Sequence, residues 1–287
     1  MKINKLAFVS LVILILITLG TLTASIWVPF SPYEMDAINK LLPPSASHWF
    51  GTDNFGRDIF SRVVYAARIS LSVGALVSVI ATVAGTISGL ISGYYPKVDN
   101  VFMRVIDGVM SIPPILLALA LVAALGGSLS TITISLSFAF WPVMTRVVRS
   151  STLQIRNIQF VEAAQASGIK DVKILFRYIL PNAIAPIIVQ GTFIFAKAVL
   201  AEAALSFLGV GIEPPTPTWG NMLGDSRDFL TIMPWYSIFP GIAIVITVLA
   251  LNILGDGLRD MMDPHKNKSK KRKKKKEVKD ELKEEAS

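Results

Sequence analysis

Few side chains in this sequence offer the chemistry of a catalytic or metal site. The chain has 287 residues and no cysteine, which excludes disulfides, thiolate metal ligands and cysteine nucleophiles. Its two histidines, His48 and His265, lie far apart in the sequence and leave little for a histidine-based metal site or catalytic triad. Asp53 and Asp58 could together suggest a cation site, but their spacing fits no calcium loop. We therefore expect these two carboxylates to be solvated or to cap a helix.

A nucleotide site and a proton relay are also disfavoured. The phosphate-binding pattern GxxxxGK followed by Ser or Thr is absent, so we do not expect the chain itself to bind ATP. Lys197 and Glu202 lie in an otherwise apolar run, where a charge facing lipid would be costly. Both should therefore face the interior of a helix bundle, water or the membrane interface. Their i,i+5 spacing is poor for a pair on one helix face, so we assign them no proton relay.

The elements that hold these residues are apolar runs long enough to cross a membrane. Hydrophobic residues make up 52% of the chain and charged residues only 17%, which is too apolar for an ordinary soluble domain. A membrane-spanning helix needs about 20 residues. We predict an all-α membrane protein with six spans, at residues 6–28, 69–94, 105–126, 129–148, 183–207 and 235–255.

The first apolar run has a second interpretation, as a cleaved signal peptide. Lys2 and Lys5 give it a basic start, and residues 23–25 are small. The apolar stretch 6–28 is nevertheless longer than the core of a typical signal peptide, which favours a retained span.

The distribution of basic residues predicts the orientation. With both termini in the cytoplasm, the inner segments hold 22 Lys and Arg residues and the outer segments hold five. Eleven of the inner ones lie in the tail 264–287, which supplies most of the net charge of +8. We interpret this tail as a disordered, solvated end that can touch anionic membrane lipid, and its composition does not favour nucleic-acid binding.

The third span is interrupted. Arg104 and Asp107 lie at its start, and Pro113 and Pro114 break the backbone hydrogen-bond ladder. Irregular backbone at membrane depth is tolerated where it is buried in protein or lines a cavity. Asp107, Pro113 and Pro114 are therefore a candidate wall of a solute pathway, and a purely structural kink is an equally open alternative.

Gly85, Gly89 and Gly93 form a GxxxGxxxG row on one face of the second span. Small residues at this spacing let another helix approach closely. We expect the row to serve packing within the bundle rather than a dedicated dimer face.

The polar segment 150–182 separates two spans and is predicted to be cytoplasmic. Asn157 is a fair N-cap for a short helix over 158–167, which Gly168 can end in a left-handed conformation. Asp171 can cap a second helix, in which apolar residues recur with helical spacing at Val172, Leu175, Phe176, Ile179 and Leu180. Pro181 should then interrupt the chain before the next span. Such a helix–turn–helix could dock on a partner, or it could pack against its own bundle.

Several motifs resemble those of a known family. The run Glu162-Ala163-Ala164, followed by Gly168 and then by Leu180-Pro181, resembles the EAA motif of bacterial ABC importer permeases. Tyr178 departs from the His that close relatives often have, which we interpret as variation without loss of coupling. Segments 48–74, 202–223 and 239–264 resemble the C-type permeases of dipeptide, oligopeptide and nickel transporters, so that the likeness covers nearly the whole chain except its tail.

This resemblance implies a type I ABC importer permease-like bundle with a cytoplasmic coupling helix. The ATPase-coupling residues would be Glu162, Ala163, Ala164, Gly168, Leu180 and Pro181. The chain would be divided into an N-terminal helix and extracytoplasmic segment (1–68), a core permease domain (69–260) and the basic tail (261–287). It would be a multi-pass protein of the cytoplasmic membrane.

The resemblance also implies partners and a function. These are a homologous second permease subunit, two cytoplasmic ATPase subunits that bind ATP and Mg, and an extracytoplasmic solute-binding protein. The chain would be a transport subunit rather than an enzyme, importing peptides or a related small solute. An ion-gradient-driven secondary transporter is disfavoured because the sequence shows few intramembrane ionisable groups and no inverted repeat. A membrane anchor for a cytoplasmic complex would leave the interrupted third span unexplained.

Overall fold

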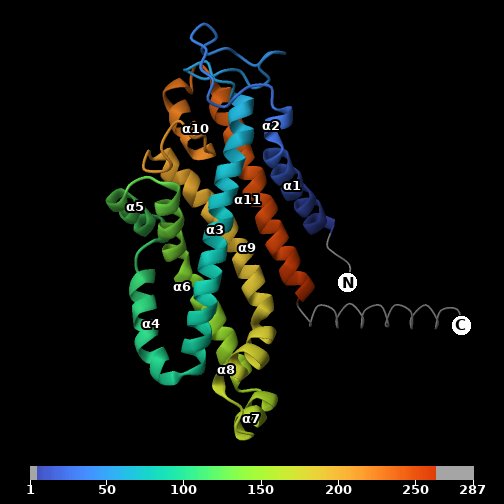
Figure 1. Ribbon diagram of the computed structural model, residues 1–287, viewed down its shortest axis with the longest axis vertical. Coiled ribbons are helices and arrows are strands. Elements are labelled where there is room, and N and C mark those ends of the chain that lie inside the picture. Colours follow the sequence, from blue (N-terminus) through green and yellow to red (C-terminus); the bar gives the residue numbers. More distant parts are fainter. Residues whose placement is uncertain (1–4, 263–287) are drawn as a thin grey trace, which may run out of the picture.

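The computed structural model describes residues 5–262, which form a bundle of long helices (Figure 1). The helical elements, in chain order, are α1 (Lys5–Leu22), α2 (Ala24–Trp27), α3 (Ile59–Tyr94), α4 (Pro96–Met110), α5 (Pro114–Leu125), α6 (Leu129–Arg156), α7 (Gln159–Ala166), α8 (Asp171–Ile174), the π-helix η1 (Leu175–Ile179), α9 (Leu180–Phe207), α10 (Trp219–Asp225), the 3₁₀-helix η2 (Ser226–Phe229) and α11 (Pro234–Met262). The predicted basic tail lies almost entirely outside the described residues.

Within the described residues, five helical segments are long and apolar enough to cross a membrane. They are α1, α3, α6, the segment Asp171–Phe207 that ends with α9, and α11. A sixth span is broken into α4 and α5, whose axes differ by 82°. The prediction of an all-α bundle with about six spans is therefore confirmed, and the break falls at Pro113 and Pro114 as expected.

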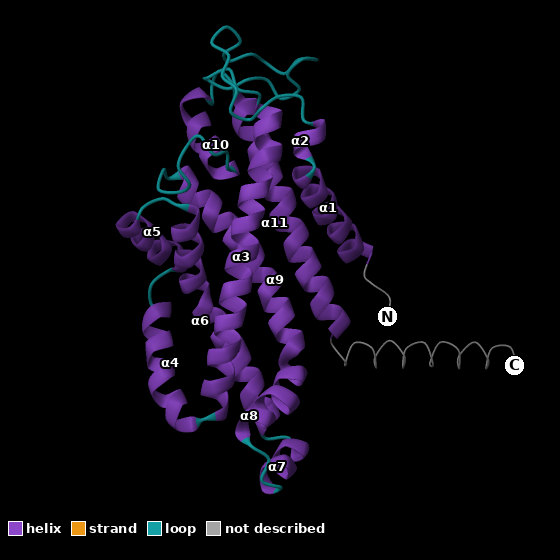
Figure 2. Ribbon diagram, viewed as in Figure 1, coloured by secondary structure: helices purple, strands orange, loops and turns teal. Residues whose placement is uncertain are grey.

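The ends of the bundle differ, as Figure 2 shows. At one end, which we call the α7 end, short connections join long helices, and α7 projects beyond them. At the other, which we call the loop end, the long segment 28–58 folds over the bundle together with α10. Any site near α7 is thus separated from the loop end by the full length of the spans.

Several predicted span boundaries were wrong, two of them at the loop end. The second span begins at Ile59 rather than at residue 69, because Asp58 caps the helix by accepting a hydrogen bond from the Ser61 backbone N–H at 2.8 Å. The predicted capping role of Asp58 is confirmed by the same contact. The first span ends at Leu22 rather than at residue 28, and the separate short helix α2 (Ala24–Trp27) follows it.

The glycine row of α3 packs against α6. A Cβ atom on Gly85, Gly89 or Gly93 would lie within 2.6 Å of a side-chain atom of α6. The α6 residues concerned are Met144, Val148 and Thr152. Backbone contact this close requires glycine, so the prediction that the row serves packing within the bundle is confirmed.

Candidate functional site

The short helix α7 covers nearly the predicted range, but the residue before its N-terminus is not the predicted cap. Its first residue, Gln159, follows Ile158, which makes no side-chain capping bond. Asn157, the predicted cap, instead ends α6, because α6 continues past its membrane-spanning part to Arg156. Gly168 has φ +69° just after the helix, so the predicted left-handed ending is confirmed.

α7 has a buried face and an exposed face. Val161 and Ala164 pack into the core of the bundle, whereas Glu162 and Ala163 are exposed. Two large apolar side chains beside them also lack cover, since Ile158 is 44% and Phe160 43% exposed. The exposed face therefore combines one carboxylate with apolar surface, which is a composition suited to contact with another protein.

The remaining residues of the EAA-like motif are distributed around α7 rather than gathered on one surface. Gly168 is exposed, and no atom lies within 4 Å of the position that its Cβ would take. Leu180 packs partly against the core, and Pro181 is exposed at the start of α9. The structure thus brings Glu162 and Ala163 onto one exposed face and separates the other motif residues from it.

The predicted second helix is instead one continuous helical segment, Asp171–Phe207. Pro181 was expected to interrupt it and does not. The turn before it, η1 (Leu175–Ile179), is π-helical, and this wider turn accommodates the proline ring and the missing backbone N–H, so the helix continues. The apolar stripe also divides. Leu175 and Ile179 are buried, but Val172 and Phe176 are 64% and 58% exposed, so the buried face is narrower than the predicted stripe.

Asp171 does not act as a helix cap, since Lys170 occupies that position. Its carboxylate accepts a hydrogen bond from the Tyr94 hydroxyl at 2.9 Å and one from the Tyr95 hydroxyl at 3.0 Å. Gln165 of α7 donates to the Tyr94 hydroxyl at 3.2 Å. Desolvation and the neighbouring Asp171 raise the pKa of Tyr95 above its ordinary value. We call Tyr94, Tyr95, Gln165 and Asp171 the tyrosine clamp.

The tyrosine clamp joins the α7 loop to the corner between α3 and α4. Arg156 at the end of α6 adds a hydrogen bond to the Tyr94 carbonyl at 2.9 Å. Tyr95 directly precedes α4, so a movement of Asp171 would act on the start of the broken span. No sequence pattern pointed to this clamp, because its members are separated by some seventy residues along the chain.

α4 is attached to α6 by two ion pairs and by an edge-to-face contact between the Phe102 and Trp141 rings. Ile106 is its only buried residue, while Arg149 holds Asp99 through two hydrogen bonds, the longer at 2.6 Å. Arg146 holds Asp107 at 2.5 Å, and both side chains are about half exposed. The candidate wall residues Asp107, Pro113 and Pro114 therefore lie on a surface that the rest of this chain leaves uncovered.

The two ionisable residues of α9 have different surroundings. Glu202 is fully buried and accepts hydrogen bonds from the Ser70 hydroxyl at 2.9 Å and the Ser206 hydroxyl at 2.8 Å, so it faces the interior as expected. Lys197 is exposed on the surface of the chain. They form no pair, in agreement with their spacing.

This architecture defines a multi-pass membrane protein with a helical projection between its fourth and fifth spans. A family model described as the binding-protein-dependent transport system inner membrane component matches residues 81–268. A second, described as the N-terminal TM domain of oligopeptide transport permease C, matches residues 1–44. The chain therefore belongs to the family of binding-protein-dependent inner-membrane transport components, and it is a permease subunit of an ABC importer.

Similar proteins support the assignment over most of the chain. The dipeptide transport system permease protein of Alkalihalophilus pseudofirmus is 47% identical over 92% of this chain and 87% of its own length. A probable peptide ABC transporter permease protein of Sinorhizobium fredii is 49% identical over 83% of this chain and 82% of its own. The glutathione transport system permease protein of Escherichia coli is 44% identical over 81% and 76%.

Proposed function

We propose that this permease subunit imports peptides and that α7 docks on a separate cytoplasmic ATPase subunit. Peptide as the solute is supported by the names of the similar proteins, which are described as transporting dipeptide, peptide or glutathione. Docking through α7 rests on one observation. Glu162 is exposed, as are the nearby Ile158 and Phe160, on a helix that lies beyond the membrane-spanning helices, while Val161 and Ala164 anchor the opposite face of α7 in the core.

In this proposal the α7 end is cytoplasmic, as are both termini. The excess of basic residues in the segments assigned to that side supports this orientation. The loop end then faces an extracytoplasmic solute-binding protein. ATP and Mg are bound by the ATPase subunits, and this chain contributes no catalytic group.

The tyrosine clamp gives a route from the ATPase to the pathway. A shift of α7 is passed through Gln165 and Asp171 to Tyr94 and Tyr95, and so to the start of α4. Because Ile106 is the only buried residue of α4, a movement of this helix disturbs little of the apolar core. The wall formed by Asp107, Pro113 and Pro114 then moves with α4, against a second permease subunit that covers the exposed α4 and α5 surface.

The division of the chain follows from the same scheme. Residues 69–260 form the core that carries the pathway and the docking loop, and residues 1–68 add a peripheral helix and a loop-end segment. The boundary between them falls inside α3, so the two parts share a helix. The basic tail from residue 261 is assigned no part in coupling.

The proposal is tested by reversing the charge of the exposed carboxylate on α7. Glu162→Lys should abolish co-purification with the ATPase subunits, or the solute-dependent stimulation of their ATP hydrolysis. Asp256→Lys is a matched control, since Asp256 is an exposed acid near the end of α11, away from α7. Docking at α7 is contradicted if Glu162→Lys retains stimulated hydrolysis and transport equal to those of the control.

A further inference from the structure

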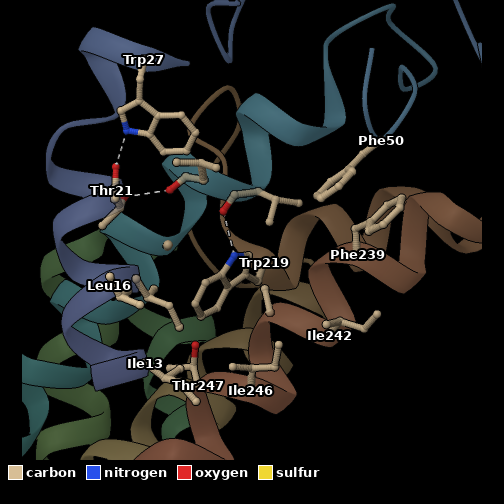
Figure 3. A pocket seen from close by; sticks show the side chains of 16 residues that line it. Ile13, Leu16, Thr21, Trp27, Phe50, Trp219, Phe239, Ile242, Ile246 and Thr247 are labelled. Carbon is tan, nitrogen blue, oxygen red and sulfur yellow. Dashed lines mark hydrogen bonds between the residues drawn. The ribbon is translucent and has the colours of Figure 1, made fainter. Parts of the chain in front are cut away.

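An apolar pocket of about 450 Å³ opens between α1, α3, α10 and α11 in the half of the bundle nearer the loop end (Figure 3). Its size is within the range of small-molecule sites, about 300–1,000 Å³. The lining includes Ile13 and Leu16 of α1, Trp219 of α10, and Phe239, Ile242 and Thr247 of α11. The assembly of transport partners proposed above assigns no role to it.

The polar groups around the pocket are mostly engaged with the protein itself. The Thr21 hydroxyl donates to the Val64 carbonyl at 2.8 Å. The indole N–H groups of Trp27 and Trp219 donate to backbone carbonyls at 3.1 and 3.0 Å. Figure 3 shows these bonds lying along the protein wall. A polar ligand would therefore lose its hydration and gain few hydrogen bonds here.

Thr247 is the exception, because its buried hydroxyl has no hydrogen-bond partner. A helical threonine can rotate to donate to the carbonyl four residues earlier, as Thr18 and Thr192 do in other spans of this chain. The Ala243 carbonyl is in that position for Thr247. The hydroxyl is thus compatible with an apolar occupant, and its removal distinguishes an apolar ligand from a polar one.

The pocket is continuous with the membrane-facing surface. Leu16, Ile242 and Ile246 line it and are also 63%, 48% and 43% exposed, so the pocket opens sideways between α1 and α11. Both helices are membrane spans, and the medium at that opening is hydrocarbon. From Phe239 to Thr247 the α11 wall extends about 12 Å along the helix axis. The α11 wall of the pocket therefore runs along the spans for about two helical turns.

Small residues and an aromatic stack keep the space open. Gly20, Ala67 and Ala243 present little side chain to it. At its loop-end side, Phe50 and Phe239 stack with ring centroids 3.7 Å apart. The pocket is therefore closed by aromatic rings at its loop-end side and open sideways between α1 and α11.

We propose that this pocket binds one acyl chain of a membrane phospholipid, which lies along α11 and fills the gap between α1 and the rest of the bundle. The apolar lining, the entrance from the lipid-facing surface and the α11 wall that runs along the spans all match a hydrocarbon chain. The bound chain completes the packing of α1, of which Ala7, Ser10 and Thr21 are the buried residues.

The test uses the full transporter in native membrane vesicles that contain a phospholipid with a photoreactive diazirine on its acyl chain. After illumination, labelled residues are identified by peptide mass spectrometry. Labelling should concentrate on Ala243, Ile246 and Thr247, well above the level at Val79, an apolar residue 60% exposed on α3. Ala243→Phe should reduce labelling of the pocket to the level at Val79. Val245→Phe, on the exposed face of the same helix, should leave it unchanged.

Other results would overturn the proposal. Uniform labelling of all exposed apolar residues would show that the pocket holds no bound chain. Cross-linking of the Thr247→Cys variant to another subunit would show that protein fills the space, and the absence of cysteine from this chain makes the attachment point specific. Loss of labelling in Thr247→Val would indicate a ligand held by the hydroxyl, whereas an acyl chain is retained at least as well. If Ala243→Phe does not fold, the label distribution in the unaltered protein and Thr247→Val still decide the question.

Discussion

The Asp171 carboxylate accepts the Tyr94 hydroxyl at 2.9 Å, which joins two residues 77 positions apart in the sequence. Asp171→Asn removes one strong acceptor from the tyrosine clamp, and hydrogen bonds to charged groups contribute about 1.5–3 kcal/mol. We expect the variant to bind its ATPase subunits and to support ATP hydrolysis, but to transport less solute per ATP hydrolysed. Uptake and hydrolysis measured together in proteoliposomes give this ratio.

Two tyrosine variants show whether the clamp itself is responsible. Tyr95→Phe should reduce the same ratio, because it removes the hydroxyl that Asp171 holds at 3.0 Å. Tyr65→Phe deletes a hydroxyl near the other end of α3 and should have no effect. An unchanged ratio in both Asp171→Asn and Tyr95→Phe would exclude the clamp from coupling.

The contact between α3 and α6 predicts a large difference between two glycines. Gly89→Ala places a Cβ 2.6 Å from the Val148 Cβ, and overpacking of this kind costs about 1–3 kcal/mol of unfolding free energy. Gly108→Ala in α4 meets no atom within 4 Å and gains helix propensity, so it should stabilise by up to about 1 kcal/mol. Thermal unfolding of the purified variants should shift in opposite directions, and equal shifts would contradict the packing.

The buried Glu202 makes the α3–α9 contact sensitive to one hydroxyl. Ser70→Ala removes a donor to this carboxylate and should lower the free energy of unfolding by about 1–3 kcal/mol. Ser72→Ala serves as the control, because the Ser72 hydroxyl bonds only within its own helix, to the Ile69 carbonyl. Thermal unfolding compares them. If the two variants are equally stable, the hydrogen bond from Ser70 to Glu202 makes no net contribution to the free energy of unfolding.

The two ion pairs of α4 should contribute unequally. Arg149 binds Asp99 with two hydrogen bonds and is 30% exposed, whereas Arg146 and Asp107 are about half exposed and share one. Exposed pairs contribute about 0–1 kcal/mol, and two-bond geometry favours the upper part of that range. Arg149→Gln should therefore increase hydrogen exchange in α4 more than Arg146→Gln does. A larger effect of Arg146→Gln would reverse this order.

Much of the fold could be predicted from the sequence, because local rules determine it. Run length and hydropathy located six spans, adjacent prolines located the break in the third, and Gly168 ended α7 as expected. The glycine row of α3 was also identified correctly. These features depend on residues that are neighbours along the chain.

The features that were missed depend on contacts between distant segments. Asp is a residue type that often caps helices, but the Asp171 carboxylate instead accepts hydrogen bonds from the hydroxyls of Tyr94 and Tyr95. The sequence predicts a helix break at Pro181, but the π-helical turn before it lets the helix continue. The apolar pocket needs four helices to form, so no single stretch of sequence indicates it.

The orientation of α5 across the bundle has a consequence for which substitutions this helix tolerates. After the 82° bend, Ala118 and Val122 are its only buried residues, Leu117 and Leu119 pack partly against the core, and most of its other side chains are exposed. On the proposed pairing, those side chains are constrained by a protein encoded by another gene. Substitutions in α5 should therefore be tolerated only together with changes in that gene, and permeases from two unrelated transporters should combine poorly even when each folds well alone.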